Sequence, residues 1–189
     1  MKSVLSSLLL AVLSTAAYSQ ANQPLVEISA EVADQYAAVV ADQRVQSALQ
    51  YIADNEPEYV EEQFRMTEIP APPFQEEVRA AYYLEQMRAR GLVDAYIDSE
   101  GNAVGLRRGT GEGPTLLITA HLDTVFPADV DTTVRLRDGR YYAPGIGDDT
   151  RGLAALLSVI DALNFTGIET TGDIMFAGKP RVSSPMPGV

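Results

Sequence analysis

An uninterrupted apolar run, Thr115–Ala120, constrains the fold of this 189-residue chain more than any other feature. The run follows a glycine-rich loop, Gly109–Pro114, and it contains no charged residue. Such a run is typical of a strand that is buried on both faces, as in the middle of an α/β sheet. The sequence therefore predicts that this segment is a central strand.

Helical and strand patterns on either side of the run indicate the fold class. Helical spacing of apolar residues predicts helices over Glu27–Glu62, Gln75–Arg90 and Thr150–Leu163. Three prolines in Thr67–Pro73 separate the first two helices, because proline cannot continue a helix. Short strands are expected at Ala95–Ile97, Asn102–Leu106, Val134–Leu136 and Asp173–Ala177. The order strand, helix, strand predicts an α/β domain with a central mixed sheet flanked by helices.

The composition excludes several classes of function. Aspartate and glutamate number 26 against 14 lysines and arginines, so the formal net charge is −12. A chain this acidic gains nothing from counterion release on DNA or RNA, which excludes a nucleic-acid partner. The absence of cysteine excludes disulfides, thiolate zinc sites and a cysteine nucleophile. The chain has one histidine, His121, so it cannot by itself complete a site that needs two imidazoles.

The first 21 residues have the pattern of a secretory signal peptide. Lys2 precedes the apolar run Val4–Leu13, and small residues follow, with cleavage expected after Ser19 or Ala21. A membrane anchor or a buried helix is the alternative, but the run is shorter than the roughly 20 residues that span a bilayer. We therefore expect a periplasmic or secreted protein that does not contact the membrane after cleavage.

Two loops carry the candidate chemistry. His121 and Asp123 come directly after the apolar run, and Asp148 and Asp149 come directly before the helix predicted at Thr150. Sites in open α/β sheets gather at the carboxyl ends of strands, and imidazole with carboxylate suits zinc. A carboxylate such as Asp123 can accept the second N–H of a metal-bound imidazole. Asp148 has two oxygens and is able to bridge two metal ions.

Each feature also has a plainer interpretation. A lone histidine is more often a surface or packed residue than a metal ligand. The Asp148–Asp149 pair is equally suited to capping a helix and to interacting with its dipole. The glycines before Asp148 suggest a phosphate loop, but their spacing is not that of a P-loop. Taken one at a time, these features do not distinguish a metal site from ordinary structure.

Together, the two motifs Ala120–Val125 and Pro144–Asp149 resemble those of the co-catalytic zinc exopeptidases of metallopeptidase family twenty. This family includes tripeptide aminopeptidase, glutamate carboxypeptidase and aminoacylase. The likeness begins with Thr67–Pro72 and Glu100–Asn102 and covers roughly Val45–Ala177. It implies that the chain is the N-terminal portion of a zinc-exopeptidase catalytic domain.

The resemblance also implies roles for three residues. His121 corresponds to a ligand of one zinc ion, Asp148 to a carboxylate that bridges two zinc ions, and Asp123 to the residue that orients the histidine. The implied reaction is cleavage of an amide bond, in a peptide or acylated amino acid, by a water molecule that two zinc ions activate. Within the family we favour a tripeptide aminopeptidase over a carboxypeptidase or deacylase. A full-length relative is expected to form a homodimer through an inserted domain.

The end of the chain departs from the family pattern. The family's catalytic glutamate is expected near Val182, yet the sequence has no glutamate after Glu169 and no second histidine. We therefore divide the chain into a signal peptide (residues 1–21), a partial catalytic domain (22–177) and an atypical tail (178–189). The tail suggests a truncated or frameshifted reading, an inactive fragment and an exposed edge strand near Phe176. The alternative is a non-catalytic secreted binding module, or pseudoenzyme, that keeps a partial metal site.

Overall fold

The computed structural model describes residues 28–180 of the chain. The expected signal peptide lies outside this part, as do residues 181–189 of the expected tail. The described elements, in chain order, are α1 (Ala30–Ala41), α2 (Gln43–Asp54), α3 (Glu56–Glu68), α4 (Glu77–Ala89), β1 (Val93–Ile97), β2 (Ala103–Arg107), β3 (Leu116–His121), β4 (Arg135–Arg137), β5 (Arg140–Tyr142), α5 (Thr150–Thr166) and β6 (Ile174–Lys179). Within residues 28–180, no helix combines the length and the apolar character that crossing a membrane requires.

The strands form one mixed sheet and one hairpin. The sheet has the order β1-β2-β6-β3, and β4 pairs with β5 in the separate hairpin. β2 runs antiparallel to both β1 and β6, whereas β3 runs parallel to β6. The chain returns from β3 to β6 through α5, because parallel neighbours need a long crossover. The predicted α/β class with a mixed sheet is confirmed.

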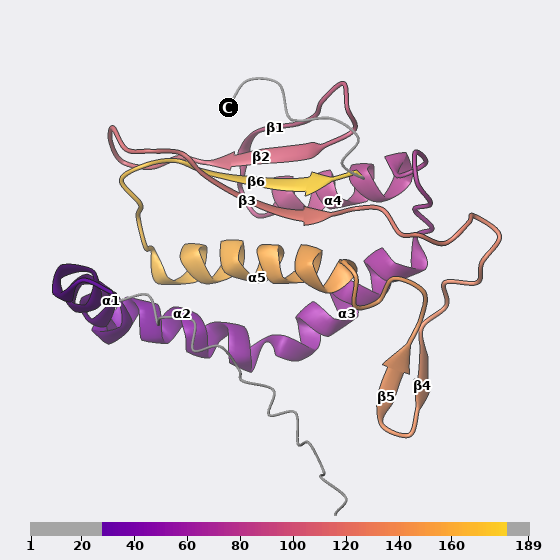
Figure 1. The fold of residues 1–189 in the computed structure, drawn as a ribbon, viewed down its shortest axis with the longest axis horizontal. Coiled ribbons are helices and arrows are strands. Elements are labelled where there is room, and N and C mark those ends of the chain that lie inside the picture. The colour runs from indigo at the N-terminus through magenta and orange to yellow at the C-terminus, as the bar shows by residue number, and fades with distance from the viewer. Residues whose placement is uncertain (1–27, 181–189) are drawn as a thin grey trace, which may run out of the picture.

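Helices cover the sheet in two successive layers. α4 packs against β1 and β2, and α5 packs against β3. Figure 1 shows α5 between the sheet and the layer formed by α2 and α3. Tyr83 of α4 donates its buried hydroxyl to the Leu153 carbonyl of α5, so the two inner helices touch each other. The core therefore lies between the sheet on one side and the helices α4 and α5 on the other. Met66 of α3 also belongs to this buried cluster.

The expectation of a central, fully buried strand at Thr115–Ala120 is wrong for the described sheet. β3 is an edge strand there, with Leu116 56% exposed and Thr119 exposed. The expected exposed edge near Phe176 is also wrong, because β6 lies between β2 and β3 and Phe176 is fully buried. An apolar run predicts a strand from local preference, whereas the order of strands depends on pairings between distant segments.

The ends of several elements differ from the sequence prediction for local reasons. The long helix expected over Glu27–Glu62 is three helices, because the chain leaves the helical conformation at Asp42, which caps α2 through the Arg44 amide, and breaks again at Asn55. α4 ends as predicted, and Gly91 follows it with a left-handed φ of 80°. β6 continues to Lys179, so the first two residues that we assigned to the tail belong to a strand.

Candidate functional site

The structure brings together the three predicted site residues. His121 is the last residue of β3, and Asp148 lies in the loop that leads into α5. The Nε2 atom of His121 is 2.7 Å from Oδ1 of Asp148. On the other side of the ring, Nδ1 is 2.9 Å from the carbonyl oxygen of Asp123 and 3.4 Å from its carboxylate. The imidazole therefore lies between one carboxylate of each loop.

The surroundings of His121 determine which ring nitrogen carries a proton. Both neighbours of Nδ1 are oxygens of Asp123, and the carbonyl can only accept, so Nδ1 donates. Nε2 faces the carboxylate of Asp148, which also can only accept while it is ionised. A cation is therefore favoured at Nε2, and this cation is either a proton or a metal ion.

The pKa of His121 reflects the same arrangement. Burial of the half-buried ring opposes its charge, but the hydrogen bonds to Asp148 and to the Asp123 backbone outweigh burial. The carboxylates of Asp123 and Asp149 add further attraction, so the pKa of His121 is raised above its usual value. The site therefore attracts positive charge.

The adjacent aspartates Asp148 and Asp149 have different roles in the structure. Asp149 caps α5, because its Oδ1 accepts from the Gly152 amide at 3.1 Å. Its Oδ2 accepts from the His121 amide at 3.1 Å, which ties the end of β3 to the start of α5. The peptide bond between the two aspartates is cis. The side chain of Asp148 is 92% exposed and contacts His121, so the helix-cap interpretation holds for Asp149 only.

Both site loops are anchored to the end of α3 and the segment that follows it. In the first loop, the Thr124 amide donates to the Ala71 carbonyl at 2.8 Å. In the second, Oγ1 of buried Thr150 is 2.7 Å from Oγ1 of Thr67 and lies 3.1 Å from the carbonyls of Gly145 and Ile146. The proline-rich segment that resembles the family is therefore part of the support for the site.

Arg79 is a supporting residue that the sequence analysis missed. It lies on α4 with its side chain fully buried, and its guanidinium donates to the Leu122 carbonyl in the first loop. Its spacing of four residues from buried Tyr83 and eight from buried Met87 was the available signal, because these positions share one helix face. A charged residue on a buried face needs partners, and sequence alone does not name them.

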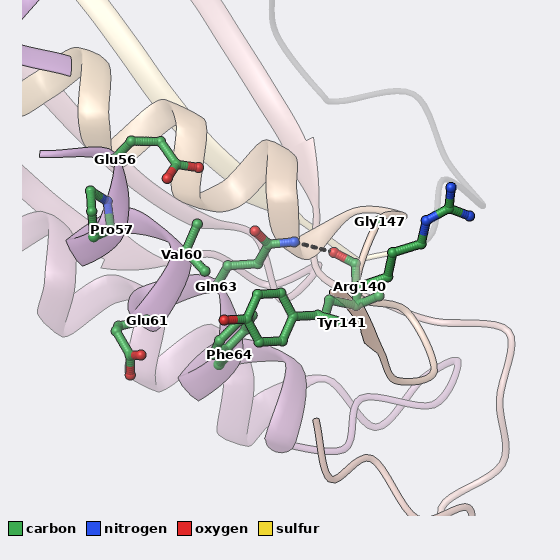
Figure 2. A pocket seen from close by; sticks show the side chains of 10 residues that line it. Glu56, Pro57, Val60, Glu61, Gln63, Phe64, Arg140, Tyr141 and Gly147 are labelled. Atoms are coloured by element: carbon green, nitrogen blue, oxygen red, sulfur yellow. Dashed lines mark hydrogen bonds between the residues drawn. The ribbon is translucent and has the colours of Figure 1, made fainter. Parts of the chain in front are cut away.

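Two cavities adjoin the second loop. The first has a volume of about 340 Å³ and contains the candidate site; its lining residues are His121, Asp123, Thr124, Val125, Phe126, Ala143, Gly145, Ile146, Gly147 and Asp148. The second, of about 590 Å³, lies between α3, β5 and the same loop. Figure 2 shows Gln63 of α3 in this second cavity, with its amide donating to the Ile146 carbonyl. The segment Ile146–Gly147 therefore separates the two spaces.

The donor atoms fit zinc in type but are few. Imidazole nitrogen and carboxylate oxygen are usual zinc ligands, and a zinc site takes three or four of them from protein. His121 and Asp148 supply two, and Nδ1 of His121 has the oxygen partner that metal-bound histidines usually have. Within the described residues 28–180, no group of three or more histidine, cysteine, aspartate or glutamate side chains is arranged to hold a metal ion.

Comparisons of the sequence with known proteins point to one family. Residues 117–181 match the model of peptidase family M20/M25/M40. A putative LysW-lysine/LysW-ornithine hydrolase of Thermococcus kodakarensis is 34% identical over 114 residues, which are 60% of this chain and 29% of the relative. Carboxypeptidase G2 of a Pseudomonas species is 35% identical over 75 residues, which are 39% of this chain and 18% of the relative. The chain thus matches less than a third of either relative's length.

Solved structures agree with this result. A tripeptidase of Staphylococcus aureus has 28% identity and a TM-score of 0.53, over 65% of this chain and 36% of that one. A dipeptidase of Saccharomyces cerevisiae shares the fold at 18% identity with a TM-score of 0.59, over 71% of this chain and 34% of that one. Over residues 117–181 the chain is therefore similar to peptidase family M20/M25/M40, and the described residues share the fold of solved di- and tripeptidase structures.

Proposed function

We propose that His121, Asp123 and Asp148 form one part of the zinc centre of a peptidase. The observation that carries this proposal is the pair of contacts on the His121 ring. Nε2 lies 2.7 Å from the exposed carboxylate of Asp148, while Nδ1 is held by oxygens of Asp123. Nε2 and a carboxylate oxygen are thus presented side by side, as two ligands of one cation must be.

Each of the three residues has its own task in this proposal. Asp123, which is buried, keeps the proton of the ring on Nδ1 and so leaves the lone pair on Nε2 for the metal. His121 would hold one zinc ion through Nε2. Asp148, whose Oδ1 contacts the ring, would hold zinc through its carboxylate. When bound, two zinc ions supply Lewis acidity that activates water for attack on an amide carbonyl.

We propose that the substrate is a peptide or an acylated amino acid. Carboxypeptidase G2 and the staphylococcal tripeptidase bear names of enzymes that cleave such bonds. Val125 and Phe126 contribute apolar side chains to the lining of the 340 Å³ cavity beside His121. This lining suits a substrate with an apolar side chain next to the scissile bond. We favour a tripeptide as the first substrate to test.

We propose further that the 189-residue chain alone binds zinc weakly and does not turn over peptide. Two ligand atoms fall short of a complete zinc site, and the sequence offers no second histidine and no glutamate after Glu169. A general base that takes a proton from water is usually a glutamate or histidine in such a reaction.

We also propose export through residues 1–21, which N-terminal sequencing of the secreted product tests.

The test is a zinc titration of the full chain, followed through the imidazole signals of its single histidine. Zinc is expected to shift the His121 signals in the parent protein and to do so at least about tenfold more weakly in D148N. D138N, at the exposed turn between β4 and β5, is the matched control and is expected to bind like the parent. Equal zinc binding by the parent and D148N would overturn the assignment of this site.

A peptidase assay with tripeptides tests whether this chain is an active enzyme or an inactive fragment. Turnover by the purified 189-residue chain contradicts the proposed inactivity and supports a complete enzyme. Zinc binding without turnover is the expected result. Absence of zinc binding in the parent removes the basis of the peptidase proposal for this chain, and it also counts against a binding module that keeps a partial metal site.

A further inference from the structure

Arg79 is a buried cation whose contacts point to the candidate site. Its side chain is fully buried on α4, in the layer between the sheet and α3. Removing a guanidinium from water is costly unless its charge and its N–H groups find partners. Burial lowers the pKa of Arg79 to about 10, although the nearby carboxylates of Asp123 and Glu76 oppose this shift. Arg79 remains charged near neutral pH.

The hydrogen bonds of Arg79 join two segments through their backbones. Nη1 donates to the Leu122 carbonyl at 2.6 Å. Nε donates to the Ile69 carbonyl at 3.1 Å, and Nη2 donates to the carbonyls of Ile69 and Thr67. The planar guanidinium therefore holds the loop after β3 against the segment after α3. The single ammonium group of lysine cannot donate to both segments in this planar geometry.

Leu122 is the residue between His121 and Asp123, so its carbonyl is part of the backbone that connects these two residues. Rotation of this peptide unit would change the direction in which the Asp123 backbone approaches Nδ1 of His121. The carboxylate of Asp123 is buried, and the charge of Arg79 is close enough to attract it. Arg79 thus holds the backbone next to Asp123 and attracts the Asp123 carboxylate.

We propose that Arg79 is a positioning residue for His121. It fixes the Leu122 carbonyl and compensates the charge of Asp123, and it thereby holds the ring with its proton on Nδ1 and its lone pair on Nε2. The effect on metal binding rests on the proposed function, whereas the effect on the ring itself does not. The plainer alternative is that Arg79 only connects two segments and has no influence on the ring.

Arg90 offers a matched control on the same helix. It follows α4, is largely buried, and donates to Asp161 of α5 at 3.0 Å. Asp161 is twelve residues beyond Asp149, the cap of α5, which places it about 18 Å along the helix from the site. Loss of Arg90 therefore removes a largely buried arginine contact at the opposite end of α4, away from the site.

The experiment uses nitrogen NMR of the metal-free full chain, in which every imidazole signal comes from His121. The parent is expected to have Nδ1–H as its main neutral tautomer. R79M is expected to lose most of this preference, and R79K to restore part of it, because lysine returns the charge without the planar guanidinium. R90M is expected to match the parent. Parent-like tautomer populations in folded R79M and R79K would overturn the proposal.

Zinc affinity is the second readout. R79M is expected to bind zinc about tenfold more weakly than the parent and R90M, as is typical when a residue supporting a metal ligand is lost. Zinc binding by R79M equal to that by R90M counts against the proposal. If the parent itself binds no zinc, the proposed function fails, and the metal-free tautomer measurement still decides the role of Arg79.

If R79M and R79K do not fold, the proposal is tested by a measurement on a variant that keeps Arg79. In H121Q, the Nε–H signal of Arg79 is expected to shift relative to the parent, whereas that of Arg90 stays unchanged. The coupling free energy between two groups is reciprocal, so if Arg79 stabilises one state of the His121 ring, replacing the ring changes the interactions of Arg79. Unchanged signals of both arginines in H121Q would overturn the proposal.

Discussion

The two loops that form the candidate site are supported in opposite ways. The loop after β3 is held by a buried cation and buried side chains, among them Arg79, Leu122 and Asp123. The loop before α5 is held by neutral hydroxyl and carbonyl groups around Thr150, and it presents Asp148 almost fully to solvent. One loop thus fixes the ring of His121, while the other presents an exposed carboxylate to it. Substitutions in the two loops should therefore separate stability from metal binding.

The largest effect is expected from removing the apolar anchor of the first loop. Leu122 is fully buried in the core, so L122A should lower the free energy of unfolding by about 2–5 kcal/mol. Chemical denaturation followed by circular dichroism measures this change. V125A, in the same loop but 79% exposed, is the control and should change stability by less than about 0.5 kcal/mol. Similar losses in both variants would show that the first loop is not anchored in the core.

A smaller loss is expected from the hydroxyl network of the second loop. T150V removes the hydroxyl that contacts the carbonyls of Gly145 and Ile146 and the hydroxyl of Thr67, and it should cost about 1–3 kcal/mol. T166V is the control, since Thr166 is at the other end of α5 and its hydroxyl reaches the carbonyl one turn earlier. We expect T166V to unfold like the parent, and an equal loss in the two variants would contradict the role given to Thr150.

The two adjacent aspartates should give contrasting results. D149A removes the cap of α5 and should cost about 1 kcal/mol in thermal or chemical unfolding. D148A should change stability by less than about 0.5 kcal/mol, because its side chain is exposed, yet it should weaken zinc binding. Parallel measurements of unfolding and zinc titration test the contrast. A larger stability loss in D148A than in D149A would reverse our assignment of the two roles.

The smallest expected effect is the dependence of stability on pH that comes from His121. Its pKa is raised in the folded chain, so the protonated ring stabilises the fold fully below the unfolded value of about 6.5. This contribution is lost as the pH rises through the raised folded pKa. In metal-free D148N the pKa of His121 should fall, and the pH dependence should shrink. Imidazole NMR titrations of the parent and D148N measure both, and equal pKa values would contradict the contact at Nε2.

Local sequence patterns predicted the helices and most of the strands. The proline-rich segment follows the end of α3, and α4 lies within the predicted range Gln75–Arg90. The same patterns did not predict the breaks at Asp42, whose side chain caps α2, and at Asn55, whose side chain donates to the Tyr51 carbonyl at the end of α2. Helix ends depend on such single contacts, whereas helix existence depends on many residues at once.

The candidate site was also predictable in part. His121, Asp123 and Asp148 stand out in sequence because they lie at the end of a strand, just after it, or just before a helix. That Asp148 reaches the ring while Asp149 caps α5 depends on the backbone of a loop far from β3 in sequence. The partners of Arg79 were equally hidden, since they are carbonyls of residues 10–43 positions away.

The sequence by itself determined the α/β class, most element types and the candidate site residues, because these depend on periodicity and on side-chain chemistry. Tertiary structure alone decided that β6 is buried and β3 lies at the edge of the described sheet. It also decided that Asp148, and not Asp149, faces the Nε2 atom of His121, and that buried Arg79 supports the loop after β3. These outcomes depend on contacts between segments distant along the chain, and a local pattern carries no information about which distant groups meet.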